Sequence, residues 1–199
     1  MTLSKAERTR QLIIEKAAPL FNRKGYADTS LQDVVAATGL TKGAIYGNFA
    51  NKDELALSVF DYNLSALKAG MAAALASEVD AAAKLIAFAG YYRSAFKGLA
   101  ARGGCPVLNA ATEADDNYPL LRPRVRAAIR SWEKAVTQVI VQGQEQGRIR
   151  KGIDAGRYAT LFIALIEGGI MLSKIMDDPA RLETALAQVE HLVRHELAT

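Results

Sequence analysis

The chain has a single cysteine, Cys105, among 199 residues, so it cannot form an intrachain disulfide. One unpaired cysteine is typical of a reducing compartment, and we therefore expect a cytoplasmic protein. The first ten residues are polar and charged, without the apolar run of a secretory signal peptide. Strand signals are also scarce, because alternating β-branched runs and Asn-Gly turns are missing. These absences exclude a disulfide scaffold and a strand-rich fold, and they predict an all-α protein.

The chain has no strong excess of either charge. The formal net charge is +4 and the pI is about 9.2, which favours a polyanionic partner only weakly. The first sixty residues carry eight Lys or Arg against six Asp or Glu, and these cations fall near expected helix ends. Bulk charge alone therefore does not identify the partner.

One apolar run is long enough to raise the question of a membrane. Residues 158–176 are mostly apolar and approach the length of a bilayer span. Glu167 lies at the middle of this run, Lys174 lies near its end, and Arg157 precedes it. A central carboxylate is costly in lipid, so we interpret the run as a buried helix of a protein that does not enter the membrane.

Alanine-rich segments with a 3.6-residue apolar period dominate the chain. Glycine, proline and capping residues divide them into helices. We expect helices at about 5–24, 30–38, 41–49, 51–76, 80–99, 107–114, 121–146, 155–176 and 179–197. The expected organisation is an N-terminal three-helix domain over residues 1–50 and a larger helical domain over residues 51–199.

The most informative segment runs from Thr29 to Leu55. Ser30 and Asp33 have the spacing of a capping box, so they mark a helix start. Gly39 occupies a sharp turn suited to positive φ, and Thr41 can cap a second short helix. In that second helix Ile45 and Phe49 are four residues apart, so we expect both to face the protein interior. Two short helices joined by a glycine turn form a helix-turn-helix, whose second helix can enter the major groove of DNA.

The same segment closely resembles the DNA-binding motif of the TetR family of transcriptional repressors. The matching residues are Ile13, Ala17, Leu20, Phe21, Gly25-Tyr26, Thr29-Ser30, Val34-Val35, Gly39, Lys42-Gly43, Ile45-Tyr46, Phe49, Asn51-Lys52 and Glu54-Leu55. The resemblance implies a dimeric DNA-binding repressor whose C-terminal domain binds a small-molecule effector and dimerises. The residues after position 60 lack the spacing of a catalytic triad, so we expect no enzymatic activity, and we expect no cofactor and no metal. A helical enzyme or small-molecule carrier without DNA binding is the alternative from another functional class.

Candidate DNA contacts follow from side-chain chemistry around the motif. We expect phosphate contacts from a hydroxyl, a phenol and an ammonium: Thr29, Tyr46 and Lys52. Lys42 can reach a guanine edge or a phosphate. The remaining candidates are Thr41 and Ala44 for a thymine methyl, and Asn48 for a base or a phosphate. The resemblance also assigns Tyr46 and Lys52 to phosphate, and it includes Thr41, Lys42 and Ala44 in the recognition helix. Gly47 and Asn48 depart from the family pattern and lower the local positive charge.

The last two expected helices carry apolar stripes suited to a dimer interface. The stripe residues are Leu161, Leu165, Leu172 and Met176 on one helix and Leu186, Val189 and Val193 on the other. Gly168 and Gly169 would allow another backbone to approach closely. Since a twofold dimer reads two half-sites, we expect a palindromic operator.

A second patch lies at Gly103–Asp116, where two glycines precede Cys105. It resembles a glycine-cysteine segment, followed by Asn and Glu, of a TetR subgroup that includes sensors of electrophiles or oxidants. Cys105 is therefore either a covalent switch or a buried apolar residue. The candidate effector-pocket residues are Tyr91, Tyr92, Phe96, Cys105, Asn109, Trp132, Phe162 and Glu167. His191 and His195 lie four residues apart but lack a third ligand nearby, so we predict no metal site.

Overall fold

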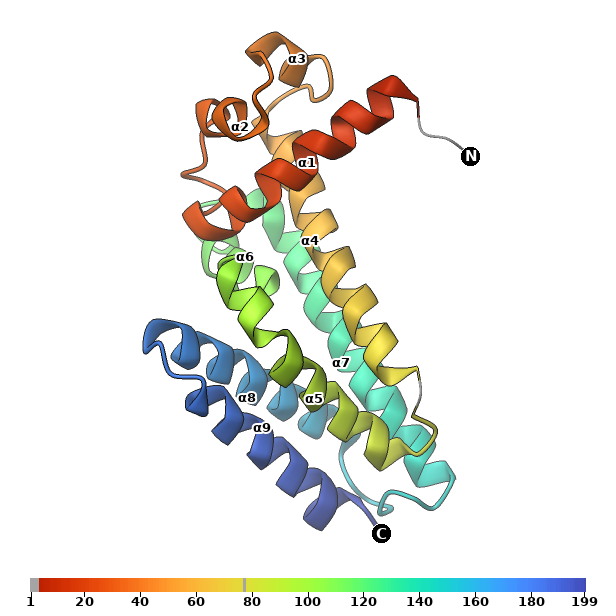
Figure 1. Ribbon diagram of the computed structural model, residues 1–199. Helices are drawn as coiled ribbons and strands as arrows, with labels where there is room; N and C mark the ends of the chain where they lie inside the picture. Colours follow the sequence, from red (N-terminus) through yellow and green to blue (C-terminus); the bar gives the residue numbers. More distant parts are fainter. Residues whose placement is uncertain (1–3, 77) are drawn as a thin grey trace. The chain divides into compact units, whose positions relative to one another are not determined.

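The computed structural model describes residues 4–76 and 78–199, and these residues form an all-α fold (Figure 1). Within them, the one strand-like feature is an isolated bridge between Ile149 and Ala198. The helices are α1 Lys5–Lys24, α2 Leu31–Thr38, α3 Lys42–Tyr46, α4 Lys52–Leu75, α5 Ala81–Ala101, α6 Pro106–Ala114, α7 Arg122–Glu145, α8 Ala155–Ile175 and α9 Ala180–Leu192. A 3₁₀ turn, η1 Pro119–Leu121, precedes α7, and a π-helical turn, η2 Val193–Leu197, follows α9.

The predicted helix positions are confirmed to within a few residues, and the differences lie at the ends. The helix that we expected to begin at Leu121 begins one residue later, at Arg122, and Leu121 belongs to η1. Pro119 lacks an N–H, so it can start this tight turn but cannot sit inside a continuous α-helix. The expected last helix is also interrupted, since α9 ends at Leu192 and the chain continues in a π-helical turn.

The chain forms two compact units, one of Met1–Leu67 with Pro106–Val125 and one of Lys68–Cys105 with Arg126–Thr199. The first unit therefore takes in residues beyond the predicted boundary at residue 50, including α6 and η1. Because compactness is a different criterion from function, the division into residues 1–50 and 51–199 stays a prediction.

The first unit is built around apolar side chains from α1, the helix-turn-helix and the start of α4. Its buried residues include Ile13, Ala17, Phe21, Tyr26, Val34, Ile45, Phe49, Leu55, Val59, Phe60 and Leu121. Ser4 begins α1 with a complete capping box to Glu7, so the free N–H groups of the first turn have acceptors. The shared apolar core therefore packs α2 and α3 against α1 and the start of α4.

In the second unit α8 and α9 lie side by side, and α5 packs against both (Figure 1). Asp80 and Asp154 cap α5 and α8, respectively, by accepting from backbone N–H groups three residues on. Helix α8 has the length and composition of a membrane span. However, its buried Phe162, Ile166 and Ile170 belong to the unit's core, and Glu167 interrupts the apolar run. Helix α8 therefore fits the core-helix interpretation.

Candidate nucleic-acid interface

The local sequence shapes the helix-turn-helix as predicted. Ser30 caps α2 and forms a complete capping box with Asp33. Gly39 follows α2 with φ 68° and ψ 8°, a left-handed conformation, and a Cβ there would meet no neighbouring atom. The requirement for glycine is therefore its backbone angle rather than space. Thr41 caps α3 by accepting from the Ala44 N–H at 3.2 Å.

Helix α3 has one buried side and one side open to solvent. Ile45 and Phe49 are almost fully buried, as predicted. Tyr46 is 50% exposed, and Thr41 and Lys42 are also exposed. The Lys42 ammonium lies 5.8 Å from the centre of the Tyr46 ring, so the two side chains share one face. This face presents an ammonium, a phenol and a threonine methyl to solvent, a combination that suits a DNA groove.

Ala44 and Asn48 are half-buried members of the same region. The Asn48 side-chain amide donates to the Ala44 carbonyl at 2.8 Å. One Asn48 N–H is therefore used inside the protein, which leaves the second N–H and the amide oxygen for external contacts, and only the N–H can bond a phosphate oxygen.

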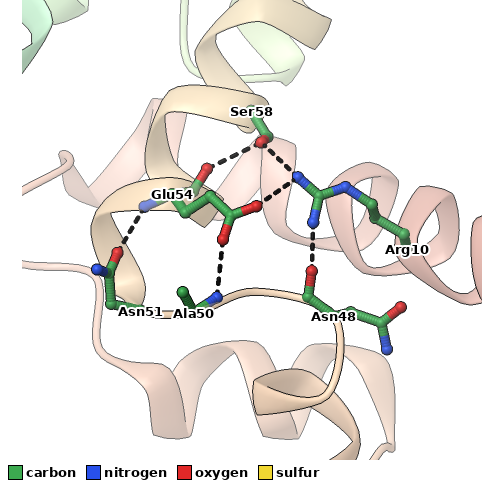
Figure 2. A network of polar contacts seen from close by, with 6 residues as sticks. All are labelled: Arg10, Asn48, Ala50, Asn51, Glu54 and Ser58. Atoms are coloured by element: carbon green, nitrogen blue, oxygen red, sulfur yellow. Dashed lines mark hydrogen bonds and ion pairs between the residues drawn. The ribbon is translucent and has the colours of Figure 1, made fainter.

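Arg10 of α1 connects the end of the recognition segment to α4, as Figure 2 shows. Its Nη1 donates to the Asn48 carbonyl, and its Nη2 donates to Glu54 Oε1 at 2.8 Å and to Ser58 Oγ at 3.3 Å. The guanidinium also lies 4.0 Å from the centre of the Phe49 ring. Arg10 therefore holds the residues after α3 against α4 by hydrogen bonds and a cation–π contact.

Glu54 is the second centre of this group of contacts (Figure 2). Its Oε2 accepts from the Ala50 N–H at 2.7 Å, and its own N–H donates to Asn51 Oδ1 at 2.9 Å. The Ala50 N–H and the Arg10 guanidinium stabilise the carboxylate and lower the pKa of Glu54. Sequence reasoning missed the role of Arg10, since its partners lie 38 to 48 residues away and no local pattern links them.

The loop between α1 and α2 lies next to a second predicted contact, Lys52. The Lys52 ammonium donates to the Ala27 carbonyl, which fixes the lysine at the start of α4. An ammonium has three donors, so two remain for a phosphate.

The expectation for Thr29 is wrong for its side chain. Thr29 is 0% exposed, and its hydroxyl donates to the Gly25 carbonyl at 2.6 Å. The Thr29 N–H donates to the same carbonyl at 3.2 Å, so the backbone and the side chain of Thr29 both close the loop internally, and the hydroxyl does not face DNA.

Several candidate effector residues gather in the core of the second unit. Tyr92, Cys105, Trp132 and Phe162 are buried. The Cys105 thiol donates to Glu167 Oε1 at 3.2 Å, while Glu167 Oε2 is buried and lacks a hydrogen-bond partner among the described residues. Burial raises the pKa of Glu167 to about 7, and the thiol hydrogen bond opposes this shift.

The thiol of Cys105 is enclosed in this structure. It is 0% exposed, and its proton is shared with a carboxylate. The thiolate is the nucleophile in cysteine chemistry, so a covalent switch would need this site to open first.

The remaining candidate pocket residues are divided between the two compact units. Asn109 belongs to the first unit, where its amide donates to the Asn22 carbonyl at 3.0 Å and to Asn22 Oδ1 at 3.1 Å. These two contacts hold the end of α1, and the place of Asn109 in the effector pocket stays a prediction. Tyr91 and Phe96 are half-buried, and Phe96 lines a shallow surface groove beside Arg93.

A second groove lies on the outer surface of α8 and α9. Its volume is about 420 Å³, and small or apolar side chains form most of its wall. The lining residues are Ala164, Leu165, Gly168, Gly169, Leu172, Arg181, Thr184, Ala185 and Gln188.

Two family models match the chain. The model described as "Bacterial regulatory proteins, tetR family" matches residues 13–59, and "Tetracyclin repressor-like, C-terminal domain" matches residues 81–189. Among curated relatives, the HTH-type transcriptional repressor DhaR of Mycobacterium sp. (strain GP1) is 27% identical over 90% of this chain and 89% of its own length. The HTH-type transcriptional regulator TtgR of Pseudomonas putida is 29% identical over 91% of this chain and 87% of its own.

Solved structures agree over nearly the whole chain. A TetR transcriptional regulator from Chloroflexus aurantiacus superposes with a TM-score of 0.94 and 39% identity, covering 98% of this chain and 99% of the other. A TetR-family regulator from Cytophaga hutchinsonii superposes with a TM-score of 0.91 and 39% identity, covering 98% of this chain and 97% of the other. The exposed face of α3, the match of both parts of the chain and these structures lead to one conclusion. The chain belongs to the TetR family, and it is a DNA-binding transcriptional regulator with a helix-turn-helix.

Proposed function

We propose that this protein is a cytoplasmic, dimeric repressor that binds a palindromic operator and is released from it by a small-molecule effector. The observation that carries the proposal is the solvent-exposed face of α3, on which Lys42 and Tyr46 lie together while Ile45 and Phe49 anchor the helix. Relatives named as repressors support the direction of regulation. The proposal includes no catalytic step.

The proposed DNA contacts are of two kinds: phosphate contacts that position the protein and base contacts that recognise the sequence. Tyr46 at the end of α3 and Lys52 at the start of α4 bind phosphates, and this phenol and this ammonium orient the recognition helix on the duplex. Lys42 reads a guanine edge, and Thr41 and Ala44 meet a thymine methyl. Asn48 adds a contact either to a phosphate through its second amide N–H or to a base through that N–H or the amide oxygen.

The proposed dimer forms through α8 and α9. Leu172 is 46% exposed and Met176 is 55% exposed, and Leu161 is exposed on the same helix. A Cβ on Gly168 would meet no atom of this chain, so the backbone there is open to a close approach. Apolar, self-complementary faces of this kind suit a twofold interface with a second copy of the chain. Such symmetry supports a palindromic operator.

The proposed effector site lies in the second unit, among Tyr92, Trp132, Phe162 and Glu167. Two buried polar atoms lack partners among the described residues there, Trp132 Nε1 and Glu167 Oε2. Buried polar groups without hydrogen bonds are costly, so an effector that supplies a partner for either would gain binding free energy.

Selection of bound oligonucleotides from a random pool tests the proposal. We expect recovery of one inverted repeat, with half-sites about one helical turn apart. Recovery of a single, non-repeated site would contradict the proposed dimer. Recovery of no enriched sequence would contradict the proposed operator. Screening small molecules for release of the selected duplex then tests the effector.

A further inference from the structure

Helix α6 contributes two side chains to the first unit that no local motif explains. Glu113 accepts from the Tyr26 N–H with both oxygens, at 2.8 and 3.1 Å, and from the Ala27 N–H at 3.0 Å. Asn109, one helical turn earlier, donates to the Asn22 carbonyl at 3.0 Å. Residues four apart on a helix share one face, so one side of α6 binds the end of α1 and the loop after it.

This loop needs such partners. Its residues follow α1, and the Tyr26 and Ala27 N–H groups have no place in a helical hydrogen-bond pattern. Gly25 ends α1 with φ 94°, and a Cβ there would lie 2.8 Å from Glu113 Oε1. The carboxylate therefore lies directly against the backbone, in a position that only glycine leaves open.

The same loop holds Lys52 from its other side. The Ala27 carbonyl accepts from the Lys52 ammonium, while the Ala27 N–H donates to Glu113. Residue 27 thus connects a carboxylate of α6 to the lysine that we propose as a phosphate contact. If the loop moves, the lysine loses the acceptor that orients it.

We propose that Asn109 and Glu113 are positioning residues for DNA binding, although they lie far outside the sequence matched to the DNA-binding model, residues 13–59. They fix the loop between α1 and α2, and through Ala27 they place the Lys52 ammonium for its phosphate. The inference rests on the proposed role of Lys52, and it gives α6 a direct part in DNA affinity.

The direction in which DNA affinity changes when Glu113 is substituted distinguishes a positioning role from a simple charge effect. Removing a negative charge from a DNA-binding unit should strengthen binding, because repulsion of the phosphates falls. Loss of a positioning contact should weaken it. A Glu113→Gln variant keeps the shape of the side chain and removes the charge, so the two explanations predict opposite changes.

The experiment measures affinity for the selected operator duplex at several salt concentrations. We expect Glu113→Gln to bind about tenfold more weakly, the usual scale for a charge-assisted hydrogen bond. The matched control is Asp116→Asn, which removes an exposed carboxylate three residues away and should bind as tightly as the wild type or slightly more tightly. Lys52→Met should lower the salt dependence by about 0.9 per phosphate lost, and Glu113→Gln should lower it in the same direction. The double variant should bind no more weakly than Lys52→Met alone.

A second variant and a local probe test whether weaker DNA binding by Glu113→Gln comes only from unfolding of the protein. Asn109→Leu removes the bond to Asn22 without a charge change and should also weaken binding. Hydrogen exchange at the Tyr26 and Ala27 amides should accelerate in Glu113→Gln while the amides of α8 keep their protection. Wild-type-like affinity in both variants, or losses that simply add to that of Lys52→Met, would overturn the inference. Failure of the wild type to select any operator would instead count against the proposed function.

Discussion

At the scale of single residues, Glu167 shows how burial changes a carboxylate. One oxygen accepts from the Cys105 thiol, and the other is buried without a partner among the described residues. Desolvation of the charged form dominates, so the pKa of Glu167 rises from 4.5 to about 7. Glu167 is half-buried as a residue, but its unpartnered oxygen is fully buried, so the charged carboxylate lacks hydration there.

This shift predicts a pH-dependent stability. The folded protein binds the Glu167 proton more tightly than the unfolded chain does, so the stabilisation is complete below pH 4.5 and is lost as pH rises through 7. Glu167→Gln should remove this loss, which is at most about 3 kcal/mol. Urea unfolding at pH 5 and pH 8 measures it, with Glu145→Gln, an exposed change on α7, as the control. Equal pH dependence in Glu167→Gln and the wild type would contradict the assignment.

Lys42 carries a second prediction at this scale. A lysine that binds a guanine edge discriminates between bases, whereas one that binds phosphate does not. Lys42→Met should therefore change the preferred base at one position in each half-site, while Tyr46→Phe should weaken binding to all sites alike. Random-pool selection with each variant provides the measurement. An unchanged consensus with Lys42→Met would reassign Lys42 to the phosphate backbone.

At the scale of elements, α3 is too short to be stable by itself. It has five residues, well below the length at which an isolated helix persists in water. Its position therefore depends on Ile45 and Phe49 in the core and on Arg10, which bonds to the carbonyl of Asn48. Contacts with the neighbouring helices therefore hold the recognition helix, α3, in place.

Removing Arg10 should accordingly weaken DNA binding without touching DNA contacts. We expect Arg10→Met to lower operator affinity about tenfold and the free energy of unfolding by about 1 kcal/mol, a modest value because the ion pair is partly exposed to solvent. Operator titration and urea unfolding measure the two effects. Lys16→Met, an exposed change on the same helix, is the control for lost charge. If both variants bind equally well, Arg10 has no special role.

At the scale of the whole molecule, the outer face of α8 and α9 is the main apolar surface to account for. Ile175 is 74% exposed and Met171 is 47% exposed, and both belong to α8, the helix that contributes Leu172 to the groove. Large exposed apolar groups gathered on one face mark an interaction surface. A second copy of the chain is the occupant that we propose.

A charged substitution on this face tests the dimer. Leu172→Glu should produce monomers, because two carboxylates would be buried in a twofold interface, and operator affinity should fall by about 100-fold or more as the half-sites bind separately. Ala187→Glu, exposed on α9 outside the groove, is the matched control. Sedimentation equilibrium and operator titration provide the readouts. A Leu172→Glu protein that stays dimeric would place the interface elsewhere.

Local chemistry made much of the fold predictable. The Ser30–Asp33 capping box, the left-handed Gly39 and the Thr41 cap involve residues within a few positions of one another, and each is present as expected. The exposed Tyr46 follows from the same period that buries Ile45 and Phe49. Thr29 was misassigned because its hydrogen-bond partner depends on how the chain folds around Gly25.

The sequence by itself determined the all-α class, the helix-turn-helix and the face of α3 that is offered to DNA, since capping, glycine conformation and apolar period act over one or two helical turns. Only the tertiary structure decided that Arg10 holds the end of the recognition segment, that Glu113 holds the loop beside Lys52, and that Cys105 is paired with Glu167. Those contacts join residues 38 to 87 positions apart along the chain. A side chain's partner at such separation is set by packing, and packing leaves no periodic signal in the sequence.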